Sequence, residues 1–271
     1  MILGLALTAP FGFDIVTKMF DSLFLIQKEI AKYWTTFLRL IYPSFCIFCE
    51  KPLSLDENYC CEPCVKALPM LRTPLCPKCA SELPPFLARK SRCSSCRNIT
   101  AYYDQGIAFF RYEDKIKTLL QHVKFSKKSW YLKIFLKFLS EIKFPISLGD
   151  YDMLVPVPMD SKRLREREFN QSELIAELIG RTKNAPPVES LLKKVRKTAP
   201  QSLLHRNERL VNLTEAFQVK KRFNLKNKKI LLIDDVMTTG ATINECARSL
   251  KEKGAKRVDF FSLARTIFSA N

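Results

Sequence analysis

The sequence predicts an α/β fold, in which a parallel sheet with flanking helices follows a small cysteine-rich module. Two observations support this prediction. Nine of the ten cysteines lie between positions 46 and 96, and after Cys96 apolar strand-like runs alternate with helical patterns. The chain has 271 residues, 47% hydrophobic and 27% charged, which is enough for one substantial core and an appendage. We expect three segments, namely 1–42, the cysteine-rich module 43–98 and the α/β domain 99–271.

The first segment contains a helical pattern over residues 19–42. Such an apolar face usually packs on its own protein, although in a basic chain it could also contact a membrane or a partner. The chain begins with an apolar run that lacks a basic n-region and is interrupted by Pro10, Asp14 and Lys18, so we expect neither a secretion signal nor a membrane span. Met19 is a second plausible start, and we expect a cytoplasmic protein. The apolar positions of the helix are Leu23, Ile26, Ile30, Trp34, Phe37 and Ile41.

The second segment contains four Cys-x-x-Cys pairs. Two thiolates separated by two residues can share one tetrahedral zinc, and two such pairs complete a four-cysteine site. We therefore expect two structural zinc ions, each held by consecutive pairs, rather than by crossed pairs. The first group is Cys46, Cys49, Cys61 and Cys64, and the second is Cys76, Cys79, Cys93 and Cys96.

Other uses of these cysteines fit less well. A disulfide framework is disfavoured because thiols stay reduced in the cytosol, and a redox role suits one pair better than four in a row. No histidine base or open coordination position accompanies the pairs, so catalytic zinc is also disfavoured. Cys60 is left over beside the second pair, and Cys246 falls in a predicted helix, where we expect a small buried apolar residue.

The third segment reads as alternating strands and helices. Ligands of parallel sheets bind beyond the carboxyl ends of the strands, so the residues that follow each strand are the candidates for a site. We expect strands at 107–112, 153–157, 216–219, 229–233 and 257–263, and helices at 113–123, from about 129 through Phe144, at 170–181 and at 241–253.

The most informative motif is the run from Ile230 to Thr242, ILLIDDVMTTGAT. Four apolar residues form a central strand, and Asp234 and Asp235 follow at its carboxyl end, where they can accept hydrogen bonds from the two hydroxyls of a ribose. Gly240 allows close approach of the backbone. Backbone N–H groups and hydroxyls of the next residues, together with the start of a helix, can surround a phosphate. These phosphate-binding candidates are Val236, Met237, Thr238, Thr239, Gly240, Ala241 and Thr242.

Positive charge is the second unusual property of the chain. Lys and Arg outnumber Asp and Glu by 45 to 27, which gives a net charge of +18 and suggests anionic partners such as phosphates, nucleic acid or an acidic membrane. A cationic cluster follows the predicted strand 153–157 and Pro158, at a strand end where a pyrophosphate needs cations, although a solvated charged face is an equal alternative for each residue. The cluster comprises Lys162, Arg163, Arg165 and Arg167.

The run 230–242 resembles the loop of type I phosphoribosyltransferases that binds 5-phosphoribosyl 1-pyrophosphate (PRPP). From about Tyr42 to Ala264 the chain resembles the ComF family, which joins a double zinc ribbon to a type I phosphoribosyltransferase fold. The shared features are the cysteine pairs, Lys124-Phe125, Val155–Pro158, Leu164 through Gln171, and an Arg/Thr/Gln/Arg/Asn set at Arg196, Thr198, Gln201, Arg209 and Asn212.

This resemblance implies a magnesium-dependent site for PRPP. Asp234 and Asp235 would orient the ribose, the loop after Pro158 would hold the pyrophosphate, and residues 196–212, with Arg196, would form a lid that stabilises the leaving pyrophosphate. His205 in that lid is more simply a surface residue than a base. The chain departs from the family pattern at Glu168 and Glu215, where relatives usually have glycine.

Relatives in the family are associated with DNA uptake in natural transformation. The resemblance therefore leaves two readings open. The protein is a phosphoribosyltransferase that acts in DNA uptake, or it is a non-catalytic protein of that machinery that binds single-stranded DNA or a DNA-uptake helicase and uses PRPP as a regulatory ligand. Zinc ribbons and a large positive charge suit contacts with nucleic acid.

Overall fold

The structure is a computed structural model that describes residues 30, 33–34, 38, 44–57, 59–87, 91–97, 101–125, 132, 146–196 and 215–267. The chain divides into two compact units, Met1–Lys66 and Ala67–Asn271. The boundary between the two units falls between the two cysteine groups. The segments that we expect from the sequence, 1–42, 43–98 and 99–271, stay predictions. The predicted helix over 19–42 and the one that ends at Phe144 lie largely outside the described residues; Ile30 and Trp34 of the former are exposed.

The first unit contains a hairpin-like turn and a short helix around the first cysteine group. Phe45 and Pro52 form an isolated antiparallel bridge, and α2 spans Glu62–Lys66. Buried Cys46, Cys61 and Cys64 form a small cluster of their own. Three thiols thus replace the apolar side chains of an ordinary core.

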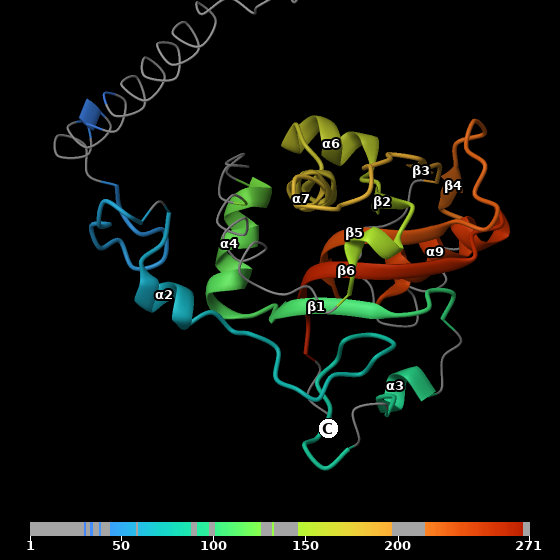
Figure 1. Ribbon diagram of the computed structural model, residues 1–271, viewed down its shortest axis with the longest axis horizontal. Helices are drawn as coiled ribbons and strands as arrows, with labels where there is room; N and C mark the ends of the chain where they lie inside the picture. Colours follow the sequence, from blue (N-terminus) through green and yellow to red (C-terminus); the bar gives the residue numbers. More distant parts are fainter. Residues whose placement is uncertain are drawn as a thin grey trace, which may run out of the picture. The chain divides into compact units, whose positions relative to one another are not determined.

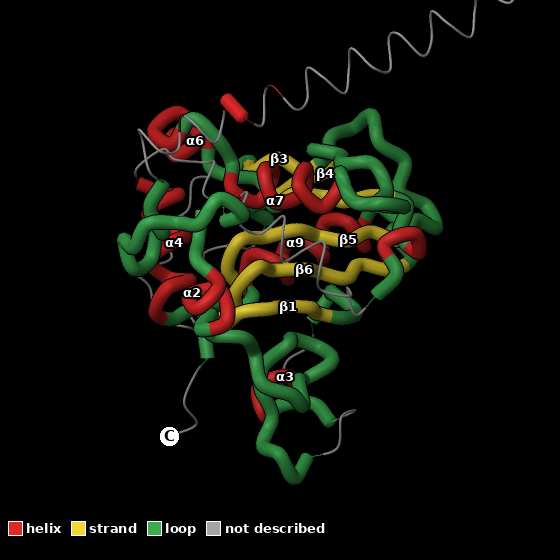
Figure 2. The backbone as a smooth tube through the Cα atoms, turned by 60° about the vertical axis from the view of Figure 1, so that its left-hand side comes forward, coloured by secondary structure: helices red, strands yellow, loops and turns green. Residues whose placement is uncertain are grey.

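The second unit is built on a four-stranded parallel sheet (Figures 1 and 2). Its strand order is β1-β6-β5-β2, and β3 and β4 form a separate antiparallel pair. The strands are β1 (Gly106–Arg111), β2 (Met153–Pro156), β3 (Leu192–Lys194), β4 (Phe217–Val219), β5 (Lys229–Met237) and β6 (Arg257–Arg265). The helices are α3 (Ser94–Arg97), α4 (Asp114–Phe125), the 3-10 helix η2 (Leu148–Asp150), α6 (Ser161–Arg167), α7 (Gln171–Gly180) and α9 (Ala241–Glu252).

The two middle strands of the sheet are apolar because both of their faces are covered. Residues 230–233 of β5 and the span from Val258 to Ala264 of β6 are buried, as expected for a parallel sheet between helices. Helix α7 packs on β2 and β5, and α9 packs on β5 and β6 and lies behind them in Figure 2. The predicted alternation of strand and helix is confirmed, and Cys246 is fully buried in α9 as expected.

The main difference from the predicted elements is α6. Residues after Pro158 were expected to form a loop, but Ser161–Arg167 form a helix that begins after Asp160, whose side chain accepts a hydrogen bond from the Lys162 N–H. The segment has no apolar face, so hydrophobic periodicity does not reveal it, whereas an Asp at the N-cap is a valid start signal. Within α7, the buried apolar residues are Ile175, Ala176, Leu178 and Ile179.

The second cysteine group belongs to the core of the second unit. Cys76, Cys79 and Cys96 are buried in the same apolar cluster as Tyr103 and Phe260, whose rings meet edge to face at 5.0 Å. Close packing extends to the backbone, since a Cβ on Gly106 would lie 2.3 Å from the Phe260 ring.

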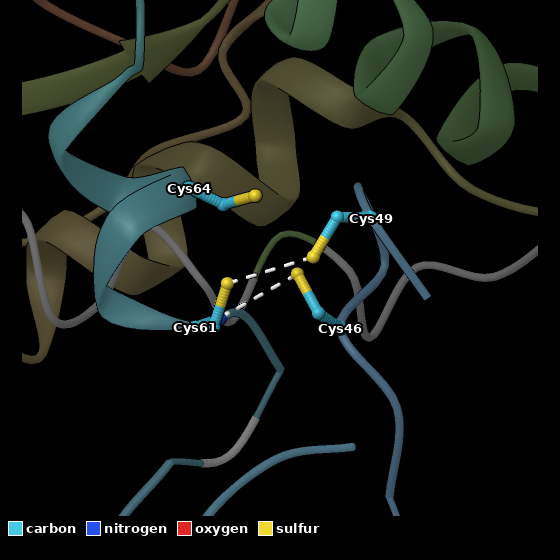
Figure 3. Close-up of side chains that lie close together, drawn as sticks. All are labelled: Cys46, Cys49, Cys61 and Cys64. Carbon is cyan, nitrogen blue, oxygen red and sulfur yellow. Dashed lines mark hydrogen bonds between the residues drawn. The ribbon is translucent and has the colours of Figure 1, made fainter. Parts of the chain in front are cut away.

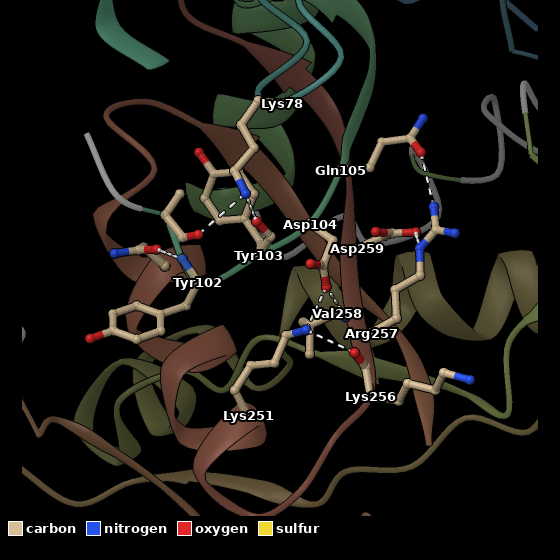
Figure 4. A network of polar contacts seen from close by, with 12 residues as sticks. Lys78, Tyr102, Tyr103, Asp104, Gln105, Lys251, Lys256, Arg257, Val258 and Asp259 are labelled. Atoms are coloured by element: carbon tan, nitrogen blue, oxygen red, sulfur yellow. Dashed lines mark hydrogen bonds and ion pairs between the residues drawn. The ribbon is translucent and has the colours of Figure 1, made fainter. Parts of the chain in front are cut away.

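Lys78, between two of these cysteines, ties the cysteine group to the sheet. Its Nζ donates to the carbonyls of Ala101, at 3.2 Å, and Tyr103 (Figure 4). The second group and the α/β sheet are therefore parts of one structure.

Candidate functional site

Two carboxylates lie side by side at the carboxyl end of β5. The Asp234 carboxylate accepts hydrogen bonds from the Ser172 hydroxyl and from the Asp235 N–H, both at 2.9 Å. One oxygen of Asp235 accepts from the Val236 N–H at 2.7 Å, and the other lies 2.7 Å from Lys124 Nζ. The pair is thus held by groups from α7, α4 and its own backbone.

The pKa values of the two carboxyl groups shift in opposite directions. Burial and the neighbouring charge of Asp235 raise the pKa of Asp234 to about 7. Burial acts in the same direction on Asp235, but the Lys124 ammonium outweighs it and holds the pKa of Asp235 below its usual range. Such a split is typical of functional carboxylate pairs, because two adjacent buried groups resist simultaneous ionisation.

The loop after β5 leads into the start of α9. Gly240 is the N-cap of this helix and adopts a positive φ of 81°, and the N–H of Ala241 donates to the Thr239 hydroxyl at 3.4 Å. The first N–H groups of a helix lack partners within the helix, and the helix dipole makes this end favourable for anions. The loop and the acidic pair lie in the wall of the same cavity of about 270 Å³.

Four cations lie in the wall of this first cavity, namely Lys124, Arg163, Arg167 and Lys194. Burial lowers the pKa of Arg167 and of Lys194, and the charge of Arg163 lowers both further. Positive groups that oppose each other in this way favour the entry of an anion that neutralises them. The cavity therefore brings together a pair of carboxylates, suited to hydroxyls or a divalent cation, and four cations, suited to phosphates.

Most of the predicted site residues meet in this cavity, and a few do not. Thr239 lines a second cavity behind the loop, and Lys162 and Arg196 are exposed and do not line the first cavity. The rest of the predicted lid, with His205, lies outside the described residues. The predicted residues in the wall are Arg163, Arg167, Asp234, Asp235, Val236, Met237, Thr238, Gly240, Ala241 and Thr242.

Sequence reasoning missed several polar residues of the wall. Lys124 and Gln171 stand in family motifs but were not assigned to the site, and Ser172 and Lys194 had no signal. Asn170 caps α7 by accepting from the Ser172 N–H and donates to the Val157 carbonyl at 2.9 Å, which places Gln171 and Ser172 beside the end of β2. Gln171 is 1% exposed, and its Nε2 has no hydrogen-bond partner among the described residues.

The eight cysteines form the two groups that were predicted. In each group the four sulfur atoms lie within 4.8 Å of one another, and those of the first group point toward one another (Figure 3). Tetrahedral zinc with Zn–S bonds of about 2.3 Å requires sulfur atoms about 3.8 Å apart. The observed separations are 3.7 Å for Cys49–Cys61 and 3.6 Å for Cys79–Cys93, so both groups fit zinc. Zinc would there cross-link segments of chain, without an open position for chemistry.

Two models of protein families match the chain. Residues 37–97 match the double zinc ribbon domain, and residues 173–267 match the phosphoribosyl transferase domain. Among the described residues, no helix is long and apolar enough to cross a membrane.

Several curated proteins are similar to nearly the whole chain. Competence protein F of Haemophilus influenzae is 28% identical over 225 residues, which make up 81% of this chain and 96% of that protein. DNA utilization protein YhgH of Escherichia coli K12 is 28% identical over 232 residues, which make up 84% of this chain and 100% of that protein. Competence protein ComFC of Bacillus subtilis is 28% identical, covering 83% and 97%. A purine phosphoribosyltransferase structure from Pyrococcus horikoshii is 14% identical, covering 59% of this chain and 87% of that one, with a TM-score of 0.26 that is too low to support an argument.

Proposed function

The chain belongs to the ComF family, and we propose that it binds PRPP together with magnesium and transfers the phosphoribosyl group to an acceptor during DNA uptake. The role in competence is supported by the phosphoribosyl transferase match and by relatives named for competence or DNA utilization.

The observation that carries this proposal is that one cavity is lined by a pair of carboxylates, by the start of α9 and by four cations. PRPP offers a matching set of groups, since its ribose hydroxyls lie between a 5′-phosphate and a pyrophosphate. Asp234 and Asp235 suit the hydroxyls, and the start of α9 suits the 5′-phosphate. Arg163 and Arg167, with Lys194, suit the pyrophosphate.

In the proposed reaction the bond between the anomeric carbon and a pyrophosphate oxygen breaks, and pyrophosphate leaves with the electron pair. The acceptor adds to the anomeric carbon and loses a proton. Magnesium would be held near the carboxylates of Asp234 and Asp235, where it would supply positive charge that stabilises the departing pyrophosphate. The residues of the chain position the ribose and stabilise the leaving anion, which are the two largest contributions expected without a covalent intermediate. The described wall of the cavity contains no histidine, so the acceptor's proton has no assigned base.

A calorimetric titration of the full zinc-loaded chain with PRPP, with and without magnesium, tests the proposal. We expect binding that requires magnesium and that is lost in an Asp234→Asn/Asp235→Asn double variant. Asp150→Asn is the matched control, because Asp150 is exposed and precedes β2, at the opposite end of the strand from the cavity. Absence of binding by the folded, zinc-loaded protein overturns the proposal. If PRPP does bind, potential acceptors can be screened next by measuring the release of pyrophosphate.

A second candidate function rests on the charge of the chain. A net charge of +18 and a double zinc ribbon suit a non-catalytic protein that contacts single-stranded DNA or a DNA-uptake helicase, with PRPP as a regulatory ligand. Affinity for a single-stranded oligonucleotide should then fall steeply between 50 and 200 mM salt, by about 10³-fold or more if six or more phosphates are contacted. PRPP binding without pyrophosphate release with any acceptor would favour this candidate.

A further inference from the structure

Arg265, the last residue of β6, is a buried cation. The residue is 5% exposed, and none of the described carboxylates forms an ion pair with it. Its Nε donates to the Ser81 hydroxyl at 2.7 Å, while its Nη1 has no hydrogen-bond partner among the described residues. A buried guanidinium normally requires a negative partner, because desolvation of an unpaired charge is costly.

The negative partner lies next to Ser81. The Ser81 oxygen is 3.4 Å from the sulfur of Cys79, a residue of the second cysteine group. A cysteine that binds zinc is a thiolate and therefore accepts hydrogen bonds. A hydroxyl can donate and accept at once, so Ser81 can donate to the Cys79 thiolate while it accepts from Arg265. The three side chains thus form a continuous link.

The second group needs such a partner more than the first one does. Four thiolates around one zinc ion have a net negative charge, and Cys76, Cys79 and Cys96 are all buried. In the first group Cys49 is exposed, so water can solvate part of that charge. Lys78 also lies near the second group, but its Nζ is bound to two backbone carbonyls. Arg97 lines the same cavity as the cysteines but is exposed, whereas Arg265 is buried and is linked to Cys79 through Ser81.

Arg265 is also tied to the loop at the first cavity. It lies opposite Met237 in the register of β5 and β6, and the N–H of Thr266 donates to the Met237 carbonyl at 3.0 Å. Met237 and Gly240 line both the first cavity and a second one of about 270 Å³, and Arg265 and Cys79 line the second. Arg265 thus lies beside the residue from which the loop starts.

We propose that Arg265, acting with Ser81, stabilises zinc at the second cysteine group and couples zinc binding there to ligand binding at the loop 237–242. Zinc fixes the position of Arg265, Arg265 fixes the end of β5, and the loop is thereby held in the shape that binds phosphate. Coupling between two sites is reciprocal, so the ligand also stabilises the zinc. The coupling rests on the proposed ribose-phosphate function, whereas the stabilisation of zinc does not.

Zinc release measures directly whether Arg265 stabilises zinc at the second cysteine group. The full zinc-loaded chain is titrated with a coloured chelator, and we expect two equivalents that leave separately. In Arg265→Gln the equivalent of the second group should leave at roughly 10- to 100-fold lower chelator concentration, the usual effect of removing a partner of a metal ligand. The other equivalent should be unchanged and serves as an internal reference.

Companion variants separate this effect from a loss of folding. Ser81→Ala should also lower the chelator concentration at which the second zinc leaves. In the double variant Ser81→Ala/Arg265→Gln the effect on zinc release should be smaller than the sum of the two single effects, since both residues act through one link. Arg265→Lys keeps the charge and should lie between the wild type and Arg265→Gln. Arg257→Gln, at the other end of β6, is the matched control, because Arg257 pairs with Asp259 rather than with the cysteines. Equal release from wild type, Arg265→Gln and Ser81→Ala overturns the assignment of Arg265.

Ribose 5-phosphate tests the coupling. It should protect the second zinc from the chelator in the wild type and give less protection in Arg265→Gln. Binding of ribose 5-phosphate without any change in zinc release overturns the coupling. A weaker zinc in Arg265→Gln, together with no binding of ribose 5-phosphate or PRPP to the wild type, overturns the proposed function and leaves the zinc assignment standing.

Discussion

The ammonium nitrogen of Lys124 lies 2.7 Å from a carboxylate oxygen of Asp235, and the two side chains are only 20% and 15% exposed. This contact joins the last turn of α4 to the end of β5. It raises the pKa of Lys124 despite the opposing effect of burial, and it lowers that of Asp235. Lys124 thereby allows one member of the acidic pair to remain charged.

Replacement of Lys124 should destabilise the second unit. Lys124→Gln leaves the Asp235 carboxylate without its cation, and we expect a loss of about 2 kcal/mol in the free energy of unfolding at pH 7. The loss should shrink as the pH falls, because in the variant the buried Asp235 has lost the cation that lowers its pKa and takes up a proton more readily. Urea unfolding at pH 7 and pH 5 measures both effects. Lys117→Gln is the control, since Lys117 is exposed on the same helix, and equal losses for the two variants would contradict the prediction.

The raised pKa of Asp234 predicts a pH dependence of ligand binding. Burial, with the charge of Asp235, raises this pKa to about 7, so ionised Asp234 becomes common above pH 7. Magnesium-dependent PRPP binding should therefore strengthen between pH 6 and pH 8. Asp234 itself acts oppositely on stability, because a folded pKa above the unfolded value of about 3.9 lowers the unfolding free energy as the pH rises from about 4 to 7.

Ser172→Ala isolates the contribution of Asp234 to that pH dependence. The Ser172 hydroxyl donates to Asp234 at 2.9 Å and thus favours its charged form. Its removal should move the midpoint of the binding profile to higher pH. Phosphate groups of PRPP also titrate near pH 6, but they do so equally with both proteins. Calorimetry at several pH values measures the midpoint, and an unchanged midpoint in Ser172→Ala argues against Asp234 as the titrating group.

The sequence predicted the parts of the site that lie in one continuous stretch. Residues 230–242 combine a buried strand, two acids and a helix start, each with a local signature, and the structure has them in that order. The cavity is also lined by Lys124, Ser172 and Lys194, which come from elements distant in the sequence. A local sequence pattern does not indicate which strand ends and helices lie together in the fold, so these residues were not predicted. Likewise, the spacing of the cysteines is similar in both groups and gives no sign that the second one packs into the α/β core.

At two positions where relatives usually have glycine, this chain has a glutamate in a backbone conformation that favours glycine. Glu168 has a φ of 70° and Glu215 a φ of 58°, in the left-handed region that favours glycine. Glu168 ends α6, where its N–H donates to the Leu164 carbonyl. The sequence indicated the two unusual positions but not their backbone conformation. Both glutamates thus occupy a backbone conformation that glycine adopts with less strain.

Glu168→Gly should stabilise the protein. The left-handed conformation costs a residue with a side chain about 1–2 kcal/mol, and the greater freedom of glycine in the unfolded chain cancels part of the gain. We expect a net increase of about 0.5–1 kcal/mol in the free energy of unfolding. Glu166→Gly is the matched control, because Glu166 is exposed inside α6 and glycine there should cost about 1 kcal/mol. Two losses of similar size would show that Glu168 is not strained.

The two cysteine groups should differ in what their loss does to the α/β unit. Cys76 is in the main core of the second unit, whereas Cys46 is in the small cluster of the first. Cys76→Ser should remove one zinc and lower the thermal midpoint of the second unit by about 10 °C, because roughly 3 kcal/mol of metal-linked stability is lost from a domain of this size.

Cys46→Ser is the matched variant for this comparison. It should also remove one zinc, yet leave the midpoint of the second unit within about 1 °C of that of the wild type. Scanning calorimetry with zinc analysis of the same samples distinguishes the two results. Equal shifts in both variants would mean that the first cysteine group also supports the α/β fold, and the division of the chain at Lys66 would then not be a division in stability.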